Sequence, residues 1–262
     1  MEARKINGIG YTVAKWPLDA AKATIVFIHG AGGTRNFWQA QVEGLAGRAN
    51  TVAIDLPGHG TSDGDGHDKV EDYARAVVDF MNAIEAPNPI TCGFSLGGAI
   101  TQQILLEYPD LARAGILICS GATMKVGPAL FESIEKDYNG FVDFICKLAS
   151  SKKTDPELVR PFREDFLSLK ADTTHGDFRA CNRFDVTDRL SSVAVPVLVV
   201  TAEEDKLTPP KFGDALEKGI KNATRAHIIG AGHIVPMEKS GEVNKSILKF
   251  IDQTGLYLGV TL

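Results

Sequence analysis

With 262 residues, the chain is long enough to bury a substantial core, as one large α/β domain or as two small domains. Apolar and charged residues make up 44% and 23% of it, which is ordinary for a soluble globular protein. The formal net charge of −5, without a cluster of lysine and arginine, argues against nucleic acid as a partner. No apolar run approaches membrane-spanning length and the N-terminus lacks a signal-peptide pattern, so we expect a cytoplasmic protein without membrane contact.

The four cysteines, at positions 92, 119, 146 and 181, are scattered along the chain and form no C-x-x-C motif. This distribution indicates reduced thiols, as expected in the cytoplasm. None of the six histidines has metal-ligand spacing to a second histidine. We therefore expect neither a structural metal nor a cofactor.

The first part of the chain alternates between predicted strands and helices. In order, it contains an edge hairpin at 5–15, a strand at 24–28, a helix at about 35–45, a strand at 51–54 and an amphipathic helix at 70–84. Both strands are continuous apolar runs, which are typical of strands buried on two faces. The first run ends in the glycine-rich loop at 29–33, and the second ends in a long turn-rich connection at 55–64.

The segment Ile90-Thr91-Cys92-Gly93-Phe94-Ser95-Leu96-Gly97-Gly98 leads from a strand-like run straight into a helical pattern at 99–106. Its G-x-S-x-G spacing is typical of a nucleophile elbow, a tight turn that thrusts a serine hydroxyl into a cleft. The glycines at 93 and 97 leave the neighbouring backbone room to make the turn. The Leu96 N–H then lies at a helix N-terminus, where it can face a developing oxyanion.

After a further strand at 114–118, the alternation of strands and helices stops. Residues 123–188 contain apolar residues at helical spacing but no buried-strand run. A structureless loop of this length is uncommon inside a domain, so a helical insertion is predicted. We expect it to divide the chain into a core in two parts, residues 1–122 and 189–262, and a helical cap or lid over Ser95, residues 123–188.

The alternation resumes with a strand at 195–201, a helix at 209–220, a strand at 226–229 and a last helix at about 238–251. Strands that alternate with helices imply a mostly parallel sheet covered by helices on both faces. The predicted fold class is therefore α/β, with an inserted helical cap.

In an open parallel sheet, ligands bind beyond the carboxyl ends of the strands. Ser95 follows the third buried strand and His233 follows the sixth. Three adjacent carboxylates follow the fifth, Glu203, Glu204 and Asp205. Serine, carboxylate and histidine in this order supply a nucleophile, a group that orients the base, and the base itself. The pattern alone does not choose among the three carboxylates.

These motifs resemble the α/β-hydrolase family over essentially the whole chain. The matching pieces are His29–Gly33, Asp55–Ser62, Gly93–Gly98, Phe184–Leu190, Ala202–Asp205 and Gly232–His233. The resemblance implies that Ser95 is the nucleophile, Asp205 the orienting acid and His233 the general base. It also implies an oxyanion hole formed by the backbone N–H groups of Ala31 and Leu96.

Residues that contact the substrate are harder to predict. Trp38 and Phe94 are candidates for lining the acyl pocket, with core packing as the alternative. His29 and His59 are expected to shape their loops rather than to take part in catalysis. Most aromatic residues of the cap have helical spacing and are expected to pack, with one or two facing the substrate: Phe131, Tyr138, Phe141, Phe144, Phe162, Phe166 and Phe178.

A serine nucleophile argues against haloalkane dehalogenases and epoxide hydrolases, whose relatives carry aspartate there. It is compatible with carboxylesterase, lactonase, thioesterase, carbon–carbon bond hydrolase and perhydrolase activity. The compact cap favours a serine hydrolase that cleaves small carboxylic esters. We expect the substrate to be a small molecule and the protein to be a monomer or homodimer. A carbon–carbon hydrolase of ring-fission products would instead need cationic cap groups, for which Arg160, Arg163, Arg179 and Arg183 are the candidates. The alternative outside enzymes is a receptor that keeps the triad but mainly binds a small molecule.

Overall fold

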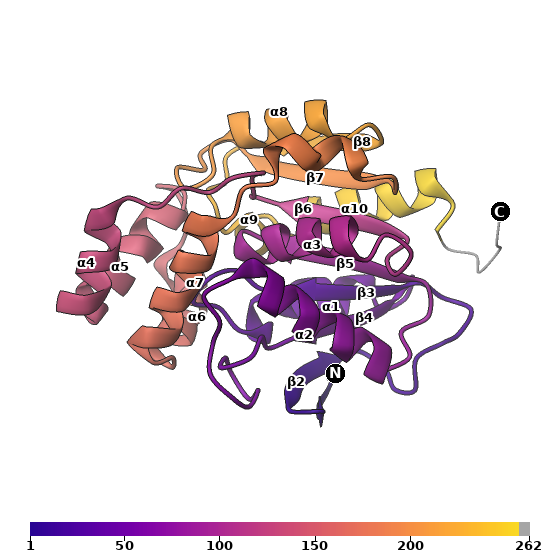
Figure 1. Ribbon diagram of the computed structural model, residues 1–262, viewed down its shortest axis with the longest axis horizontal. Coiled ribbons are helices and arrows are strands. Elements are labelled where there is room, and N and C mark those ends of the chain that lie inside the picture. The colour runs from indigo at the N-terminus through magenta and orange to yellow at the C-terminus, as the bar shows by residue number, and fades with distance from the viewer. Residues whose placement is uncertain (257–262) are drawn as a thin grey trace.

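Eight strands form a single sheet in the computed structural model, which describes residues 1–256 (Figure 1). The strands are β1 (Glu2–Ile6), β2 (Ile9–Val13), β3 (Thr24–Ile28), β4 (Asn50–Ile54), β5 (Pro89–Phe94), β6 (Ala114–Ile118), β7 (Val197–Ala202) and β8 (Ala223–Ile228). Their order across the sheet is β1-β2-β4-β3-β5-β6-β7-β8. The hairpin β1–β2 is antiparallel and pairs antiparallel with β4, whereas the remaining pairs are parallel.

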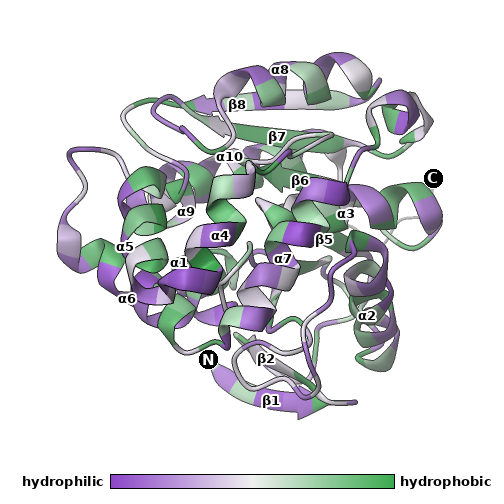
Figure 2. Ribbon diagram, turned by 60° about the vertical axis from the view of Figure 1, so that its left-hand side comes forward, coloured by the Kyte–Doolittle hydropathy of each residue, from purple (hydrophilic) through white to green (hydrophobic). Residues whose placement is uncertain are grey.

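The central strands are buried on both faces because their side chains alternate between two apolar layers. In β3, Ile25 and Phe27 pack into one layer, and Val26 and Ile28 pack into the other. Every residue of β3, β4 and β6 is buried. Figure 2 shows β6 and β7 as hydrophobic strands at the centre of the molecule, while the helices around them carry many hydrophilic residues.

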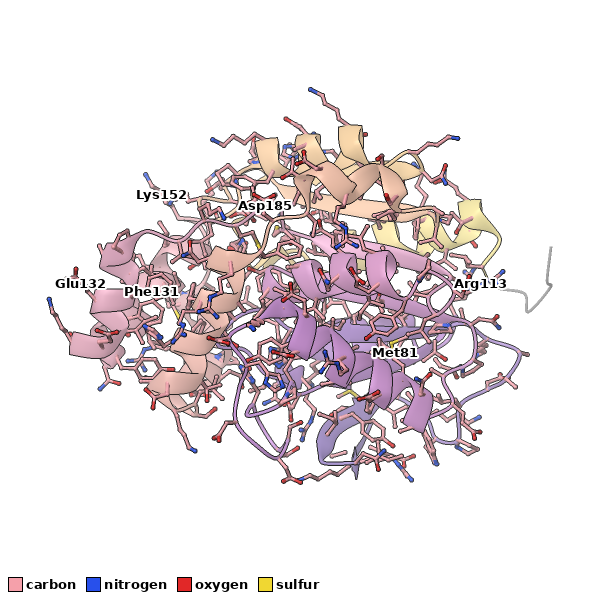
Figure 3. The ribbon with its side chains drawn as sticks, viewed as in Figure 1. Met81, Arg113, Phe131, Glu132, Lys152 and Asp185 are labelled. Carbon is pink, nitrogen blue, oxygen red and sulfur yellow. The ribbon has the colours of Figure 1, made fainter. Side chains whose placement is uncertain are left out.

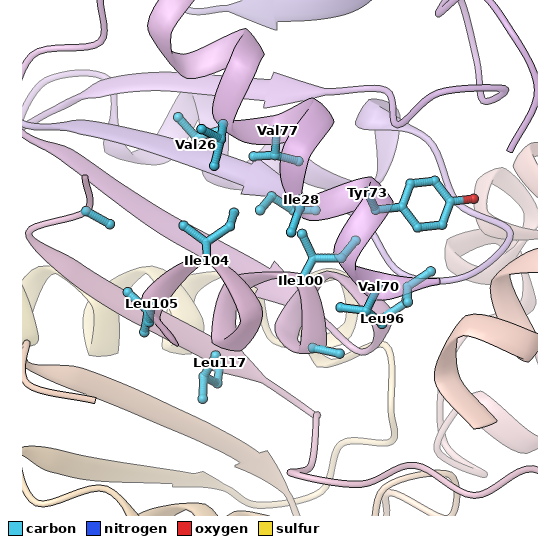
Figure 4. Close-up of a cluster of buried hydrophobic side chains, with 14 of the residues drawn as sticks. Val26, Ile28, Val70, Tyr73, Val77, Leu96, Ile100, Ile104, Leu105 and Leu117 are labelled. Carbon is cyan, nitrogen blue, oxygen red and sulfur yellow. The ribbon is translucent and has the colours of Figure 1, made fainter. Parts of the chain in front are cut away.

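Helices cover the two faces of the sheet. On one face lie α1 (Gln39–Leu45), α9 (Val235–Glu238) and α10 (Ser240–Thr254). On the other lie α2 (Val70–Ala83), α3 (Leu96–Glu107) and α8 (Pro210–Gly219). Figure 4 shows α2 and α3 contributing Val77, Ile100 and Ile104 to the layer that covers Ile28 of β3. This architecture confirms the predicted α/β class with a mostly parallel sheet.

Four helices are inserted between β6 and β7, and they lie together at one end of the sheet (Figure 1). They are α4 (Pro128–Lys136), α5 (Tyr138–Ala149), α6 (Pro156–Leu167) and α7 (Ala171–Arg183). A single antiparallel bridge between Thr123 and Asp185 joins the two ends of the insertion. We call α4–α7 the cap helices, and they correspond to the helical insertion predicted between residues 123 and 188.

Some predicted bounds differ from the structure. The first turn of the helix expected at 35–45 is a 3-10 turn, η1 (Arg35–Trp38), which the Thr34 side chain caps. The last strand begins at Ala223 and ends before Ile229, which is 60% exposed. β8 is an edge strand, and Ile228 is its one buried residue. Residues 257–262, the end of the second core part predicted at 189–262, lie outside the described residues. No helix within residues 1–256 is both long and apolar enough to cross a membrane.

Candidate active site

Ser95 stands at the sharp turn between β5 and α3. Its backbone has φ 53° and ψ −113°, a region that side-chain-bearing residues rarely occupy and that costs on the order of 1–3 kcal/mol. The turn is possible because the residues two positions before and two positions after Ser95 are glycines. A Cβ atom at Gly93 would overlap the Gly97 carbonyl, and one at Gly97 would overlap the Ile28 carbonyl of β3. The elbow therefore packs backbone against backbone, and Ser95 is left half-buried at its apex.

His233 and Asp205 form a buried pair at the same edge of the sheet. The Nδ1 atom of His233 lies 2.8 Å from Oδ2 of Asp205, and both residues are almost fully buried. The carboxylate also accepts hydrogen bonds from the backbone N–H of Leu207 and from the N–H and hydroxyl of Thr208. Burial by itself raises the pKa of Asp205, but His233 and the Thr208 donors outweigh it, so the pKa lies below its ordinary value. Asp205 is thus ionised at neutral pH.

The two glutamates next to Asp205 point elsewhere. Glu203 accepts a hydrogen bond from the Gly230 N–H at the surface, at 2.9 Å. Glu204 accepts one from the Ser151 hydroxyl, at 2.8 Å. Of the three carboxylates that the sequence offered, Asp205 alone contacts His233 in the part of the chain that the structure describes.

Ser95 and His233 both line a cavity of about 240 Å³. Its wall is largely apolar, and each cap helix contributes to it: Leu130 from α4, Ile145 from α5, Phe162 and Phe166 from α6, and Phe178 from α7. The cap helices therefore lie directly over the elbow. The outer side of the cap carries other aromatics. Phe144 is 54% exposed, and Phe131 packs on His175 and is seen on α4, away from the sheet, in Figure 3.

The two predicted substrate contacts have different outcomes. Phe94 lines the cavity, and its ring centroid lies 4.7 Å from that of His233. Trp38 is not among the lining residues, and its indole is fully buried against Phe27 and Phe37. The reason is that η1 directs Trp38 back onto β3. Trp38 is therefore a core residue, and its assignment as a substrate contact is corrected.

The two residues whose backbone N–H groups the sequence resemblance assigns to an oxyanion hole lie near Ser95 in different ways. Leu96 is the first residue of α3, so the helix itself supplies no acceptor for its N–H. Ala31 lines the cavity and lies in a turn closed by the Gly33 N–H, which donates to the Gly30 carbonyl at 3.1 Å. We call residues Gly30–Gly33 the oxyanion turn, after the role that the sequence resemblance predicts for Ala31.

His29 fixes the peptide that carries the Ala31 N–H. Its Nε2 accepts a hydrogen bond from the Leu56 N–H, so its Nδ1 carries the proton and donates to the Gly30 carbonyl at 2.8 Å. Burial and the neighbouring His59 lower the pKa of His29 to about 4, so the ring is neutral at neutral pH. Because C=O and N–H point in opposite directions across a trans peptide, holding the Gly30 carbonyl also aims the Ala31 N–H.

Sequence reasoning missed two residues that support the pair. Thr208 lies three residues after Asp205 and donates its hydroxyl to that carboxylate, a local turn pattern that the spacing could have revealed. Glu238 accepts a hydrogen bond from the Gly232 N–H next to His233, and another from the Ser151 N–H at the end of α5. It thereby ties the loop that carries the histidine to the cap, a contact with no signal in the sequence.

One group of side chains could in principle offer ligands to a metal. Among residues 1–256, ligand atoms of Cys119, Asp205 and His233 lie within 4.8 Å of one another. His233 Nδ1 and Asp205 Oδ2 are 2.8 Å apart, the distance of a hydrogen bond between them. Burial and the charge of Asp205 also raise the pKa of the Cys119 thiol well above its usual value, which keeps it protonated.

The four cap arginines are occupied at the surface. Arg160 pairs with Glu157 and Glu164, and Arg163 pairs with Asp143. Both Arg179 and Arg183 pair with Asp68. None of the four lines the cavity. Within the described residues, Lys125 is the only lysine or arginine that does.

The fold and the arrangement of the site define an α/β hydrolase. A sequence model of the alpha/beta hydrolase fold family matches residues 23–240, and the chain belongs to this family. Among solved structures it is similar to a thermophilic esterase, with 30% identity, a TM-score of 0.83 and coverage of 97% of this chain and 98% of that one.

Curated relatives have several activities. A putative carbamate hydrolase, RutD, of Rhizobium rhizogenes is 28% identical over 87% of this chain and 92% of its own length. The 3-oxoadipate enol-lactonase 1 of Acinetobacter baylyi is 26% identical over 82% of this chain and 83% of its own. These proteins share a hydrolytic reaction but differ in the bond that they cleave, so the chain is a hydrolase of this family.

Proposed function

We propose that this protein is a serine hydrolase that cleaves small carboxylic esters through an acyl-enzyme intermediate. The observation that carries the proposal is the convergence of Ser95 and the His233–Asp205 pair on one mostly apolar cavity. A serine hydroxyl is a weak nucleophile unless a base removes its proton, and a buried carboxylate keeps such a base in the required tautomer. Ser95, His233 and Asp205 are the three groups that this chemistry needs.

In the acylation step, Ser95 Oγ attacks the ester carbonyl while His233 Nε2 takes its proton. The carbonyl oxygen becomes an oxyanion, which accepts hydrogen bonds from the N–H groups of Ala31 and Leu96. As the tetrahedral intermediate collapses, the bond to the alcohol oxygen breaks and His233 returns the proton to it. Asp205, ionised and bonded to Nδ1, stabilises the imidazolium that forms between the two transfers.

Deacylation repeats the sequence with water. His233 Nε2 removes a proton from water as the water oxygen attacks the acyl carbonyl, and the same two N–H groups hold the new oxyanion. Collapse then breaks the bond to Ser95 Oγ, which recovers its proton from His233. The carboxylic acid leaves and the enzyme is restored.

The cavity supports a substrate with a compact apolar part. Its volume is about 240 Å³ and its wall is formed by residues such as Ile145, Phe162 and Phe178. Burial of an apolar acyl or alcohol group there contributes binding free energy in proportion to the area removed from water. The esterase similar in structure at 30% identity is consistent with this substrate class.

Lactones are a second candidate substrate class, favoured by the similarity to the enol-lactonase from Acinetobacter baylyi. A lactone is an internal ester, so the same attack and the same oxyanion serve it, and the leaving alcohol stays attached to the acyl group. A ring-fission diketone has less support, because none of the four cap arginines lines the cavity.

A substrate panel tests the proposal. p-Nitrophenyl esters of rising acyl length, small lactones and a ring-fission diketone are assayed with the wild type, with Ser95→Ala as the background control. Saturable ester hydrolysis that is lost in Ser95→Ala supports the proposal. Hydrolysis confined to lactones favours the second candidate. Tight binding of esters without turnover contradicts both and favours a receptor.

A further inference from the structure

Asp177 joins the cap to three separate parts of the core. It lies on α7, is fully buried, and receives three hydrogen bonds. Its Oδ2 accepts from the Gly32 N–H of the oxyanion turn and from His59 Nε2, each at 2.9 Å. Its Oδ1 accepts from the Tyr73 hydroxyl of α2 at 2.6 Å. A buried carboxylate satisfied by donors from other segments is costly to leave unpaired, so these contacts fix α7 against the core.

The histidine in this cluster is held in its charged form. His59 Nε2 faces the carboxylate of Asp177, and its Nδ1 faces the Pro57 carbonyl at 3.0 Å. Both partners can only accept, so both ring nitrogens carry protons. Burial by itself lowers the pKa of His59, but Asp177 and the Pro57 carbonyl outweigh it and raise the pKa above 6.5. The neighbouring His29, with its ring centroid 4.8 Å away, is neutral.

The contact with Gly32 reaches the proposed oxyanion hole. Gly32 has φ 69° and follows Ala31, so the direction of its N–H is set by the peptide between the two residues. A rotation of that peptide would break the bond to Asp177 and disturb the turn that presents the Ala31 N–H. The ring of Phe166, also from the cap, packs where a side chain of residue 32 would lie. The cap thus contacts the oxyanion turn through two residues, Asp177 and Phe166.

We infer that the Asp177–His59 ion pair is a positioning device, through which the cap keeps the oxyanion turn in its working geometry. The inference rests on the proposed ester hydrolysis. It makes the reactivity of Ser95 depend on the docking of α7, although neither Asp177 nor His59 touches the reacting atoms. The oxyanion is present in the tetrahedral intermediate and the transition states that flank it but not in the bound ester, so loss of the pair lowers kcat more than it raises KM.

The pair also predicts the direction of a pH effect. His59 has a raised pKa, so its charge is fully present below pH 6.5 and is lost as the pH rises through the raised value. The groups that face His59 are Asp177 from α7, Asp55 after β4, His29 after β3 and Tyr73 from α2. Once His59 is neutral, one ring nitrogen faces an acceptor without a proton, and kcat falls on the alkaline side.

Asp177→Asn tests the inference, because the amide has the same shape and removes the charge. Asp172→Asn is the matched control, since Asp172 is an exposed carboxylate on the same helix. We expect Asp177→Asn to lower kcat about tenfold, with little change in KM, because a displaced oxyanion donor costs part of the 10²–10³ that a deleted one costs. The alkaline fall of kcat should disappear with the charge of His59. Asp172→Asn should match the wild type in both respects.

A merely structural role would lower the melting temperature of Asp177→Asn and leave its kcat and pH profile like those of the wild type, which would overturn the inference. If Asp177→Asn does not fold, the wild type labelled with ¹⁵N-histidine still decides. A titration midpoint of His59 above 6.5, with both ring nitrogens protonated below it and the signals assigned with His59→Gln, supports the pair, and a midpoint at or below 6.5 contradicts it. Failure of the proposed function is distinct, because the wild type itself would then hydrolyse no ester.

Discussion

At the scale of single residues, the site is built from side chains whose proton positions are fixed by their partners. His233 donates from Nδ1 to Asp205, which leaves Nε2 free to accept a proton. His29 is neutral because one ring nitrogen accepts from the Leu56 N–H and the other donates to the Gly30 carbonyl. His59 faces two acceptors, so both of its ring nitrogens carry protons. Three histidines of one protein therefore have three different electrostatic roles, which their hydrogen-bond partners determine.

The first residue-scale prediction concerns the carboxylate beside His233. Asp205→Asn should reduce kcat by about 10⁴, because the amide would favour the wrong tautomer of His233 while leaving the fold intact. Glu203→Gln and Glu204→Gln serve as matched controls, since their carboxylates face Gly230 and Ser151 instead. Steady-state kinetics on a p-nitrophenyl ester measures all three. A severe defect in either glutamate variant, together with an active Asp205→Asn, would show that the acid is misassigned.

At the scale of elements, the cap helices form much of the wall of the cavity, and we expect them to select the substrate. Each of the four contributes apolar side chains to the cavity wall, while the elbow and the loop of His233 come from the core. We therefore expect selectivity and chemistry to reside on different parts of the chain. The two parts meet where α7 contacts the oxyanion turn through Asp177, and where α5 meets Glu238.

A pair of cap substitutions tests this separation. Phe178 lines the cavity, whereas Phe144 is 54% exposed on the outside of the cap. Phe178→Ala enlarges the cavity and should shift the ratio of kcat/KM between longer and shorter acyl esters by about tenfold in favour of the longer. Phe144→Ala should leave that ratio unchanged. An unchanged preference in Phe178→Ala would mean that the acyl group binds elsewhere.

At the scale of the whole molecule, the sequence predicts the core sheet well because its strands are short continuous apolar runs. The strand at 24–28 coincides with β3, and the strand at 114–118 coincides with β6. The edge strand β8 was predicted less accurately, since all of its residues except Ile228 are partly or fully exposed and the apolar signal is weak. A strand whose residues are all buried has a clear apolar pattern in the sequence, whereas an edge strand lacks this pattern.

The site was predictable to the extent that it follows the strand ends. Ser95, Asp205 and His233 occupy the carboxyl edge because parallel strands end there, which topology alone implies. The contacts of Asp177 with Gly32 and His59 could not be predicted, because they join segments more than a hundred positions apart and depend on how the cap docks. The core position of Trp38 likewise depends on the 3-10 turn that holds it.

Global stability gives a further prediction from two helical glycines. A Cβ at Gly97 would overlap the carbonyl of Ile28, whereas one at Gly241 of α10 would meet open space. Gly97→Ala should lower the free energy of unfolding by about 1–3 kcal/mol or more, because backbone of the elbow must move. Gly241→Ala should raise it, by up to about 1 kcal/mol. Urea unfolding of both variants checks this, and equal stabilities would contradict the packing described for the elbow.

Covalent labelling identifies the nucleophile, which the proposed mechanism assigns to Ser95. The wild type is treated with a p-nitrophenyl phosphonate ester, followed by intact mass measurement and peptide mapping. The predicted result is one adduct per chain, located on Ser95, with release of one p-nitrophenol and loss of ester hydrolysis. Ser95→Ala, folded like the wild type, should take up no label. An adduct on another residue, or undiminished ester hydrolysis by Ser95→Ala, would contradict the mechanism.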